Sequence, residues 1–537
     1  MSASSRIVSL STEELAAPTP LYVTFAAAEK MFASIGSRPA ESGGALGGTR
    51  RSSVVEHLHL DESASMTSVT YYPDITAVNE TLRRDWNPRG INLMGFAHSH
   101  PRGATRPSAN DLEYSERILR AIPAMGRMLL PIVQSAGDGG PAQIIPWAVE
   151  RRGAAMVLTE PRLHIADPAR LPDVEASRVF ARVRDAYHLP TLAAARVVVG
   201  GAGGSAAWLI DLARTGVCEF VLIDPDVVEE PNLATQHVSL DDLGEPKVSA
   251  LARRITAVNP FAHVVTVQAD VMDIDDEAFA RLLKSPFPSA GTRVPARTLL
   301  CAFTDDFPAQ ARIARLGLQF DLPTITATIY ERGLGVELAF AASGVTRACI
   351  RCALSSRYRQ QVLEGQDAVV ASNGSPLWAT ARLNALKTPI ALALLHATAA
   401  PAARTHPGTQ RWLRALEAIT DRNLVLTSLD PEIGDELGLH QFGAAADPLA
   451  GLSPLDMTLW RRPVPDHPRY DEVSCPECGG MEALSERAGR FLDTRPMPRV
   501  FGDSEFPCPA AHPASPRVHA TRRRRSLRQL LGGRGER

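Results

Sequence analysis

Short apolar runs with a strand-like period fill the chain between residues 20 and 165. Small, β-branched and aromatic residues alternate there with polar ones, as in half-buried strands. These runs read LYVTF, SVVEHLHL, SVTYYP, NLMGFAH, MLLPIVQ and QIIPWAVE. Two stretches have helical spacing instead, AAAEKMFASIG and SANDLEYSERILRAI, and Ser108 stands where the second helix needs an N-cap. The pattern predicts a compact α/β unit.

A different pattern begins near residue 170. Continuous apolar runs, typical of fully buried strands, alternate with helical stretches. The runs are ARVVVGG, EFVLID, HVVTVQAD and RTLLCAF, and the helical stretches cover residues 204–216, 246–258, 275–284 and 307–319. This alternation predicts a parallel, doubly wound sheet that continues to about residue 480. Both units are therefore of the α/β class.

The same patterns divide the chain into five parts. Residues 1–19 are expected to be a flexible N-terminus, 20–165 the first domain, and 166–190 a linker with a leading helix. Residues 191–480 form the doubly wound domain. Residues 481–537 are rich in Pro and Arg, and we expect this tail to be disordered.

Composition and charge narrow the class of protein. The 537 residues carry a formal net charge of −2, which does not indicate bulk attraction to nucleic acid or membranes. No apolar run reaches the roughly 18–20 residues that a bilayer helix needs, and the first twenty residues lack the pattern of a signal peptide. We expect a cytoplasmic protein. Four of the seven cysteines form two CxxC pairs, which in such a chain suggest a metal before a disulfide.

Two histidines near the end of a predicted strand offer metal ligands. His98 and His100 are one residue apart, so both side chains can point to one face, and Asp111 offers an oxygen from the first turn of the next helix. Three protein ligands and one open position are typical of catalytic zinc, which makes bound water acidic. Ser108 is placed to donate to a developing oxyanion, and Glu41 is the candidate carboxylate that moves the proton.

This spacing, Glu…His-x-His-Pro-x6-Ser-x2-Asp, resembles the JAMM motif of the JAB/MPN metalloproteases. It is carried by Glu41, His98, His100, Pro101, Ser108 and Asp111. The resemblance implies a JAB/MPN-like fold and zinc-dependent hydrolysis of peptide or isopeptide bonds at the C-terminus of ubiquitin-like proteins. The alternatives are histidines that merely cap a strand, and a metal-free relative of the enzymes.

A glycine-rich turn joins the first strand and helix of the second domain. Gly201, Gly203 and Gly204 allow the backbone to approach a phosphate at the helix N-terminus. Asp224, about twenty residues further on, is placed to bind a ribose hydroxyl. The turn by itself is compatible with NAD, with FAD or with a purely structural role.

The stretch that follows resembles the ThiF/MoeB and ubiquitin-activating-enzyme superfamily. The matching residues are Asp224, Asp226, Val228, Asn232, Leu233, Gln236, Gly244 and Lys247. The resemblance implies a Rossmann-like domain that binds ATP and adenylates a C-terminal carboxylate. It makes Lys247 the partner of the α-phosphate and Asp305, in CAFTDDFPAQARI, the Mg²⁺ ligand.

Two positions depart from the superfamily pattern. Ala206 replaces the last glycine of the turn, and Thr235 replaces the arginine expected before Gln236, which removes a contact to the triphosphate. In this superfamily a further arginine often arrives from the helix before the first strand, sometimes across a dimer interface. Arg182 or Arg184 is the candidate for that role, and a homodimer through the adenylation domain is expected.

The paired cysteines predict a second, structural zinc. Four thiolates leave no open position on a tetrahedral zinc, and redox chemistry is the alternative. The four residues are Cys349, Cys352, Cys475 and Cys478. Ubiquitin-activating enzymes carry their thioester cysteine between such pairs, but residues 353–474 contain no cysteine. Cys218 and Cys301 read as core residues, which leaves Cys508 in the tail as the exposed candidate.

Together these features favour a bifunctional enzyme that processes and activates a ubiquitin-like protein ending in diglycine, with a separate conjugating enzyme as a further partner. One alternative is a sulfur-carrier system, in which the adenylate becomes a thiocarboxylate. Another is a non-catalytic scaffold that binds a ubiquitin-like partner, for which Thr235 is the main support.

Overall fold

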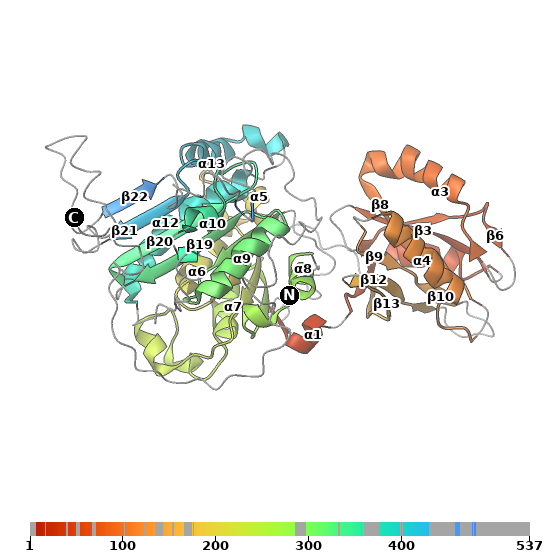
Figure 1. Ribbon diagram of the computed structural model, residues 1–537, viewed down its shortest axis with the longest axis horizontal. Helices are drawn as coiled ribbons and strands as arrows, with labels where there is room; N and C mark the ends of the chain where they lie inside the picture. Colours follow the sequence, from red (N-terminus) through yellow and green to blue (C-terminus); the bar gives the residue numbers. More distant parts are fainter. Residues whose placement is uncertain are drawn as a thin grey trace. The chain divides into compact units, whose positions relative to one another are not determined.

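The computed structural model contains two compact units (Figure 1). It describes residues 7–16, 18–38, 41–49, 54–66, 71–100, 103–122, 125–134, 143–152, 155–165, 174, 177–284, 297–330, 333–355, 357–358, 375–397, 399, 401–428, 457–461, 475 and 477–478. The small unit spans Glu13–Leu171 with Ala280–Pro295, and the large unit spans Met1–Thr12, Pro172–Phe279 and Ala296–Arg537. Among the described residues, no helix combines the length and apolar character needed to cross a membrane. The tail assigned to residues 481–537 lies outside the described part of the chain.

A mixed sheet forms the centre of the small unit. Its order is β11-β10-β8-β9-β12-β13, and β3 pairs antiparallel with both β8 and β5. The strands of this unit are β2 (Leu21–Val23), β3 (Gly43–Thr49), β4 (Val54–Val55), β5 (His57–Leu60), β6 (Ser65–Met66), β7 (Tyr71–Tyr72), β8 (Ile91–His98), β9 (Arg127–Leu129), β10 (Ile132–Gln134), β11 (Gln143–Ile145), β12 (Ala148–Arg152), β13 (Ala155–Thr159) and β14 (Leu163–Ile165).

Helices cover both faces of this sheet. On one face, α2 (Phe25–Ser34) packs its buried Met31 into an apolar cluster with Leu46 of β3. On the other face, α3 (Ile75–Thr81) and α4 (Ala109–Ala121) supply Val78 and Leu119 to a second cluster. The helix α4 begins where the sequence predicts, because Ser108 caps it: Asp111 N donates to Ser108 Oγ at 3.3 Å.

The large unit is built on a nine-stranded sheet of order β1-β17-β16-β15-β18-β19-β20-β21-β22. Its strands are β1 (Ile7–Leu10), β15 (Ala195–Gly200), β16 (Glu219–Ile223), β17 (His263–Val267), β18 (Arg297–Ala302), β19 (Thr324–Tyr330), β20 (Gly335–Ala341), β21 (Leu424–Ser428) and β22 (Met457–Arg461). The first six strands of this order are parallel, as the sequence predicts, and the last three continue the sheet antiparallel. The prediction of a parallel sheet therefore fails only for the last three strands, because β19 and β20 follow each other too closely for a parallel crossover.

Helices again lie on both faces. The apolar sides of α6 (Ala206–Arg214), α7 (Lys247–Val258) and α12 (Leu377–Ala397) share one core, and α9 (Phe307–Gln319) joins another. The remaining helices of this unit are α5 (Leu189–Ala193), α8 (Asp276–Lys284), α10 (Ile350–Ala353) and α13 (Pro407–Glu417). The predicted helical stretches agree with α6, α7, α8 and α9 to within a few residues.

The N-terminus corrects the sequence prediction. Ile7–Leu10, assigned to a flexible segment, is a strand that pairs in parallel with β17, from Ile7 opposite Val264 to Leu10 opposite Val267. Thr12–Ala16 forms the short helix α1. The small unit is thus inserted in the chain between the edge strand of the large sheet and the rest of that sheet. In the described part of 166–190, where a leading helix is expected, the chain forms a 3-10 turn at Arg178–Phe180, and the short helix α5 begins at Leu189.

Candidate functional site

Three potential metal ligands converge at the end of β8. His98 is its last residue, His100 lies two residues beyond, and Asp111 comes from the first turn of α4. The two Nε2 atoms are 2.8 Å apart, and each lies 3.5 Å from Asp111 Oδ2. The histidines are almost fully buried. The structure therefore brings together the three residues that the sequence proposes as ligands.

Backbone pairing and a helix cap hold this cluster. Gly43 of β3 pairs with His98, and Ser42 N donates to Ser99 Oγ at 3.0 Å, which places the segment containing Glu41 beside the histidines. The Ser108 hydroxyl and its backbone N–H both donate to Asp111 Oδ2 at 2.7 Å. Ser108 therefore caps α4 and orients the carboxylate of the candidate metal ligand Asp111 with the same side chain.

The charges at the site are tuned by burial and by hydrogen bonds. Burial opposes ionisation of Asp111, but hydrogen bonds from His100, His98 and Ser108 hold the pKa of this carboxyl well below its usual range. Glu41 behaves in the opposite way, because its burial raises its pKa against the attraction of the two histidines. The neighbouring carboxyl groups of Asp111 and Glu41 therefore have pKa values shifted in opposite directions, as acid–base chemistry requires.

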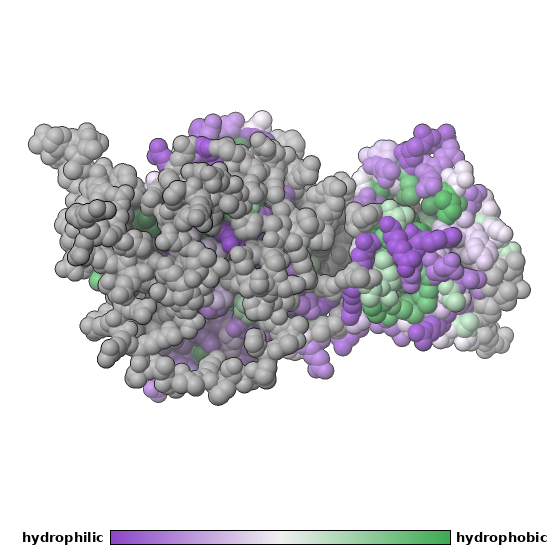
Figure 2. Space-filling model, viewed as in Figure 1, coloured by the Kyte–Doolittle hydropathy of each residue, from purple (hydrophilic) through white to green (hydrophobic). Residues whose placement is uncertain are grey.

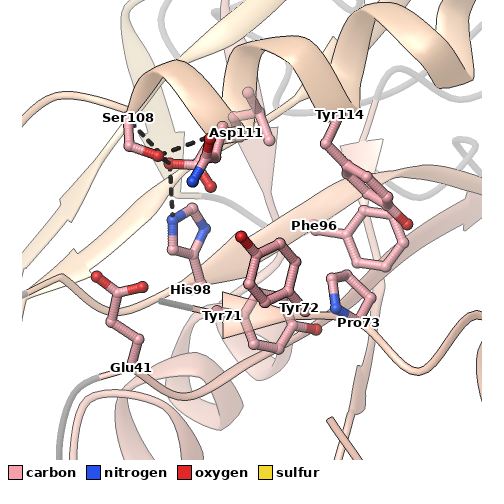
Figure 3. A pocket seen from close by; sticks show the side chains of 11 residues that line it. Glu41, Tyr71, Tyr72, Pro73, Phe96, His98, Ser108, Asp111 and Tyr114 are labelled. Carbon is pink, nitrogen blue, oxygen red and sulfur yellow. Dashed lines mark hydrogen bonds and ion pairs between the residues drawn. The ribbon is translucent and has the colours of Figure 1, made fainter. Parts of the chain in front are cut away.

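A cavity of about 500 Å³, including its part open to solvent, contains these groups. Glu41, His98, Ser108 and Asp111 lie on one side of it, and aromatic side chains lie on the other (Figure 3). The geometry fits a catalytic zinc. Two imidazole nitrogens and a carboxylate oxygen all lie within 4.8 Å of one another, at the edge of this solvent-open cavity. Pro101, the remaining motif residue, lies outside the described residues.

The glycine turn of the large unit is shaped by close backbone contacts. Gly201 has φ +97°, and a Cβ on it would meet the carbonyl oxygen of Phe303 at 2.6 Å. A Cβ on Gly203 would meet the Gln236 amide at 2.8 Å, whereas Gly204 is exposed. Ala206, which replaces a glycine of the family pattern, begins α6 without disturbing this turn.

The acidic residues after β16 connect the turn to α7. Asp224 accepts hydrogen bonds from Ala202 N at 2.7 Å and Asp226 N at 3.0 Å, and burial raises its pKa. Asp226 in turn accepts a hydrogen bond from the Lys247 ammonium at 2.9 Å. The side chain of Asn232 caps a 3-10 turn by accepting from Glu229 N at 2.9 Å. The carboxyl ends of neighbouring parallel strands thus gather the proposed nucleotide ligands along one edge, as is usual in this fold.

The other proposed ATP-site residues are exposed. Asp305 lies in the loop after β18, and Arg182 and Arg184 lie in turns before α5. Thr235, in place of the expected arginine, uses its hydroxyl to bond Pro231 O at 3.2 Å. A triphosphate contact from Arg182 or Arg184 stays a prediction.

The four paired cysteines meet in one buried cluster. Their sulfur atoms lie within 4.8 Å of one another, with Cys349 and Cys475 3.9 Å apart and Cys352 and Cys478 3.7 Å apart. An all-thiolate set at these distances fits a tetrahedral structural zinc. Cys218 and Cys301 are fully buried, as expected for core residues, and Cys508 lies outside the described part.

The large unit also contains a buried polar network that the sequence does not predict. Arg357 donates to Glu337 at 2.8 Å and to Thr328 at 3.3 Å. Gln310 donates to Thr328 at 2.9 Å and to the carbonyl oxygen of Thr304 at 2.5 Å, one residue before Asp305. No local sequence signal marks these residues, because the partners come from segments that are far apart in the chain.

The sequence matches two protein families. Residues 27–144 match the prokaryotic homologs of the JAB domain (Prok-JAB), and residues 177–443 match the ThiF family. Over 246 residues the chain is 26% identical to ubiquitin-like modifier-activating enzyme 5 of Drosophila virilis, covering 44% of this chain and 58% of that protein. Over 82 residues it is 46% identical to the SAMP-activating enzyme E1 of Haloferax volcanii, covering 15% of this chain and 30% of that protein.

The chain therefore spans less than two thirds of the length of these curated relatives. A crystal structure of E. coli MccB with ATP aligns at a TM-score of 0.31 and 17% identity, covering 43% of this chain and 67% of that one. At this TM-score the similarity carries no argument.

Proposed function

We propose, on the premise that this chain joins a Prok-JAB domain to a ThiF-family domain, that it both cuts and activates the C-terminus of a ubiquitin-like protein. The small unit would be a zinc-dependent peptidase or isopeptidase, and the large unit an ATP-dependent adenylyltransferase. The observation that carries the proposal is the convergence of His98, His100 and Asp111 beside Glu41 and Ser108.

In the hydrolytic site, each side chain has a separate task. A zinc ion on His98, His100 and Asp111 would supply an acidic water and polarise the scissile carbonyl. The Glu41 carboxylate, whose pKa burial raises, accepts a proton from the attacking water and delivers it to the leaving nitrogen. The Ser108 hydroxyl has a single proton, which it donates to Asp111 at 2.7 Å in this structure; in the reaction it turns from Asp111 and donates to the oxygen that becomes negative.

In the adenylating site, the chain positions the reactants. The backbone N–H groups of the glycine turn and the start of α6 face the phosphates, and Asp224 accepts from a ribose hydroxyl while it braces the turn. Lys247 stabilises negative charge on the α-phosphate as the substrate carboxylate attacks and pyrophosphate leaves. Asp305 is the ligand for Mg²⁺.

Both activities act on the same part of the substrate, the flexible C-terminal tail of the ubiquitin-like protein. Hydrolysis exposes the terminal carboxylate of a precursor or releases the modifier from a target, and adenylation then activates that carboxylate. Two of the relatives, a ubiquitin-like modifier-activating enzyme and a SAMP-activating enzyme, support this substrate class.

The test combines two assays on the full chain. Small diglycine-ending proteins are incubated with ATP, Mg²⁺ and labelled pyrophosphate, and C-terminally extended versions are examined by mass spectrometry for removal of the extension. We expect carrier-dependent exchange, and cleavage that stops when zinc is chelated. No pyrophosphate exchange with any carrier, together with intact extensions, would refute the proposal and leave the scaffold role.

A sulfur-carrier role is the second candidate. It is favoured by the absence of cysteine from residues 353–474 and by the full burial of Cys218 and Cys301, which leave no exposed thiol near the adenylate in the described residues. Adding a sulfide donor to the activation reaction and weighing the carrier distinguishes the two. A thiocarboxylate product supports this role, whereas transfer to a conjugating enzyme supports the first.

A further inference from the structure

The cavity of the small unit has two chemically different sides. The side that holds Glu41, His98 and Asp111 is polar, and the opposite side is an aromatic wall (Figure 3). We define the aromatic wall as Tyr71, Tyr72, Pro73, Phe96, Tyr114 and Leu130. The residues assigned to hydrolysis all lie on the polar side, so the aromatic wall is available to contact a part of the substrate that does not react.

Tight packing fixes this wall beside the metal ligands. The Tyr71 ring stacks on His98 with 5.8 Å between centroids, and its hydroxyl lies 3.4 Å from Asp61. The same ring rests on the backbone of Gly43, where a Cβ would come within 2.6 Å of it. Phe96 is almost fully buried and meets Tyr114 edge-on at 5.9 Å. The wall is thus a preformed surface, which is characteristic of a binding site.

One polar atom in the wall has no partner. The Tyr114 hydroxyl is buried and makes no hydrogen bond within the described part of the chain. Burial raises the pKa of Tyr114 to about 12, so the hydroxyl remains a donor at neutral pH. A buried donor without an acceptor is costly, and a ligand carbonyl would gain this hydrogen bond once the Tyr114 side chain turns toward the cavity.

The apolar surface continues outward from the cavity. Tyr72 is 51% exposed and Ile75 is 45% exposed, although both are large apolar side chains. Met66, in the β6 strand that pairs with β7, is 39% exposed. Figure 2 shows apolar atoms at the surface of the small unit beside the polar outer face of α4. An apolar rim next to an apolar pocket is typical of a site that binds an extended peptide.

We propose that this site cleaves linear precursors in which a large apolar or aromatic residue directly follows the diglycine. The inference rests on the proposed function. The wall lies beside the metal ligands, since Tyr71 stacks on His98. The two residues before the scissile bond are glycines, so the nearest side chain that can fill the wall is that of the residue directly after the bond. An aromatic side chain matches the wall through stacked and edge-on contacts, and the Tyr114 hydroxyl, once turned toward the cavity, can donate to a carbonyl of the extension.

The test measures binding apart from turnover. Fluorescent peptides with the sequence Gly-Gly-X-Ser-Ser at their C-terminus, where X is Phe, Leu, Gly or Asp, are titrated against the zinc-loaded full chain carrying Glu41→Gln. A fifth peptide joins the diglycine to a lysine side chain. We expect Phe and Leu to bind about ten-fold more tightly than Gly, with Asp and the isopeptide weaker. The same order is expected for kcat/KM in the wild-type chain.

A matched pair of variants tests the wall itself. Because Tyr72 is exposed, the Tyr72→Ser variant is expected to keep the fold. It is expected to reduce the preference for Phe over Gly about three-fold. Phe25→Ser removes a ring that is 59% exposed on α2, away from the cavity lining, and leaves the preference unchanged. Equal binding and cleavage of all linear peptides, or a preference for the isopeptide, overturns the inference but not the proposed function. No binding and no cleavage of any peptide overturns both.

Discussion

The Lys247 ammonium lies 2.9 Å from the Asp226 carboxylate and is only 12% exposed, whereas Asp226 is 49% exposed. The lysine begins α7 and the aspartate follows β16, so this ion pair joins two elements at the edge where the glycine turn lies. Because Asp226 is half-exposed, solvent screens this ion pair, which adds little stability. The pair holds the ammonium at the edge where the proposed phosphate site lies.

Lys247→Ala is expected to lower pyrophosphate exchange about 100-fold or more, because a preorganised charge at the reacting phosphate is lost. Exchange of labelled pyrophosphate into ATP, with the carrier present, measures the effect. Arg214→Ala removes another exposed cation, paired with Asp211 at 2.9 Å, and serves as the control with unchanged exchange. Equal rates in the two variants would show that Lys247 has no part in adenylation.

His98→Ala is expected to remove one of two zinc equivalents and to abolish cleavage of extended carriers, because two remaining ligands hold zinc weakly. Pyrophosphate exchange should be unaffected, since the nucleotide site lies in the other unit. Metal content by atomic emission and the two activity assays measure this. A variant that retains two zinc equivalents would contradict the ligand assignment.

Arg357→Ala is expected to destabilise the large unit by about 3–5 kcal/mol, because it leaves the buried Glu337 carboxylate without its cation. Urea unfolding followed by tryptophan fluorescence measures the change. The double variant Arg357→Met/Glu337→Leu removes both charges and should recover much of the loss. If the double variant is no more stable than the single one, the ion pair does not account for the effect.

Lys387 gives the large unit a specific pH dependence. The Lys387 Nζ atom is buried 4.0 Å from the ring centroid of Phe303 and 5.2 Å from that of Trp208. Burial lowers the pKa of Lys387 to about 7, and Cys301 is the titratable group that faces it. The unfolded lysine has a pKa of about 10.4. Between these values the unfolded chain binds one more proton than the folded chain, so stability rises with pH by up to about 1.4 kcal/mol per unit.

Lys387→Met should therefore be more stable than the wild type at pH 7, and should lack this rise between pH 7 and 9. Urea unfolding at pH 7, 8 and 9 compares the two slopes. Parallel slopes would show that Lys387 does not change its protonation on folding in this range.

Local patterns in the sequence determined much of this protein. The strand ending at His98, the cap at Ser108 and the first turn containing Asp111 are each set by a few neighbouring residues, so motif spacing was enough to name the three ligands that the structure brings together. The same holds for the glycine turn and for helices such as α9, whose predicted and observed bounds coincide. The roles of these residues in catalysis stay predictions.

Contacts between distant segments were decided only by the tertiary structure. Ile7 pairs with Val264, Arg357 meets Glu337 and Gln310, and Tyr71 stacks on His98, although none of these partners is close in the sequence. Each partner alone is an ordinary apolar or polar residue whose neighbours permit many surroundings. The edge strand, the buried network and the aromatic wall depend on packing that minimises exposed apolar surface and unpaired polar groups over a whole unit, and no short stretch of sequence carries that information.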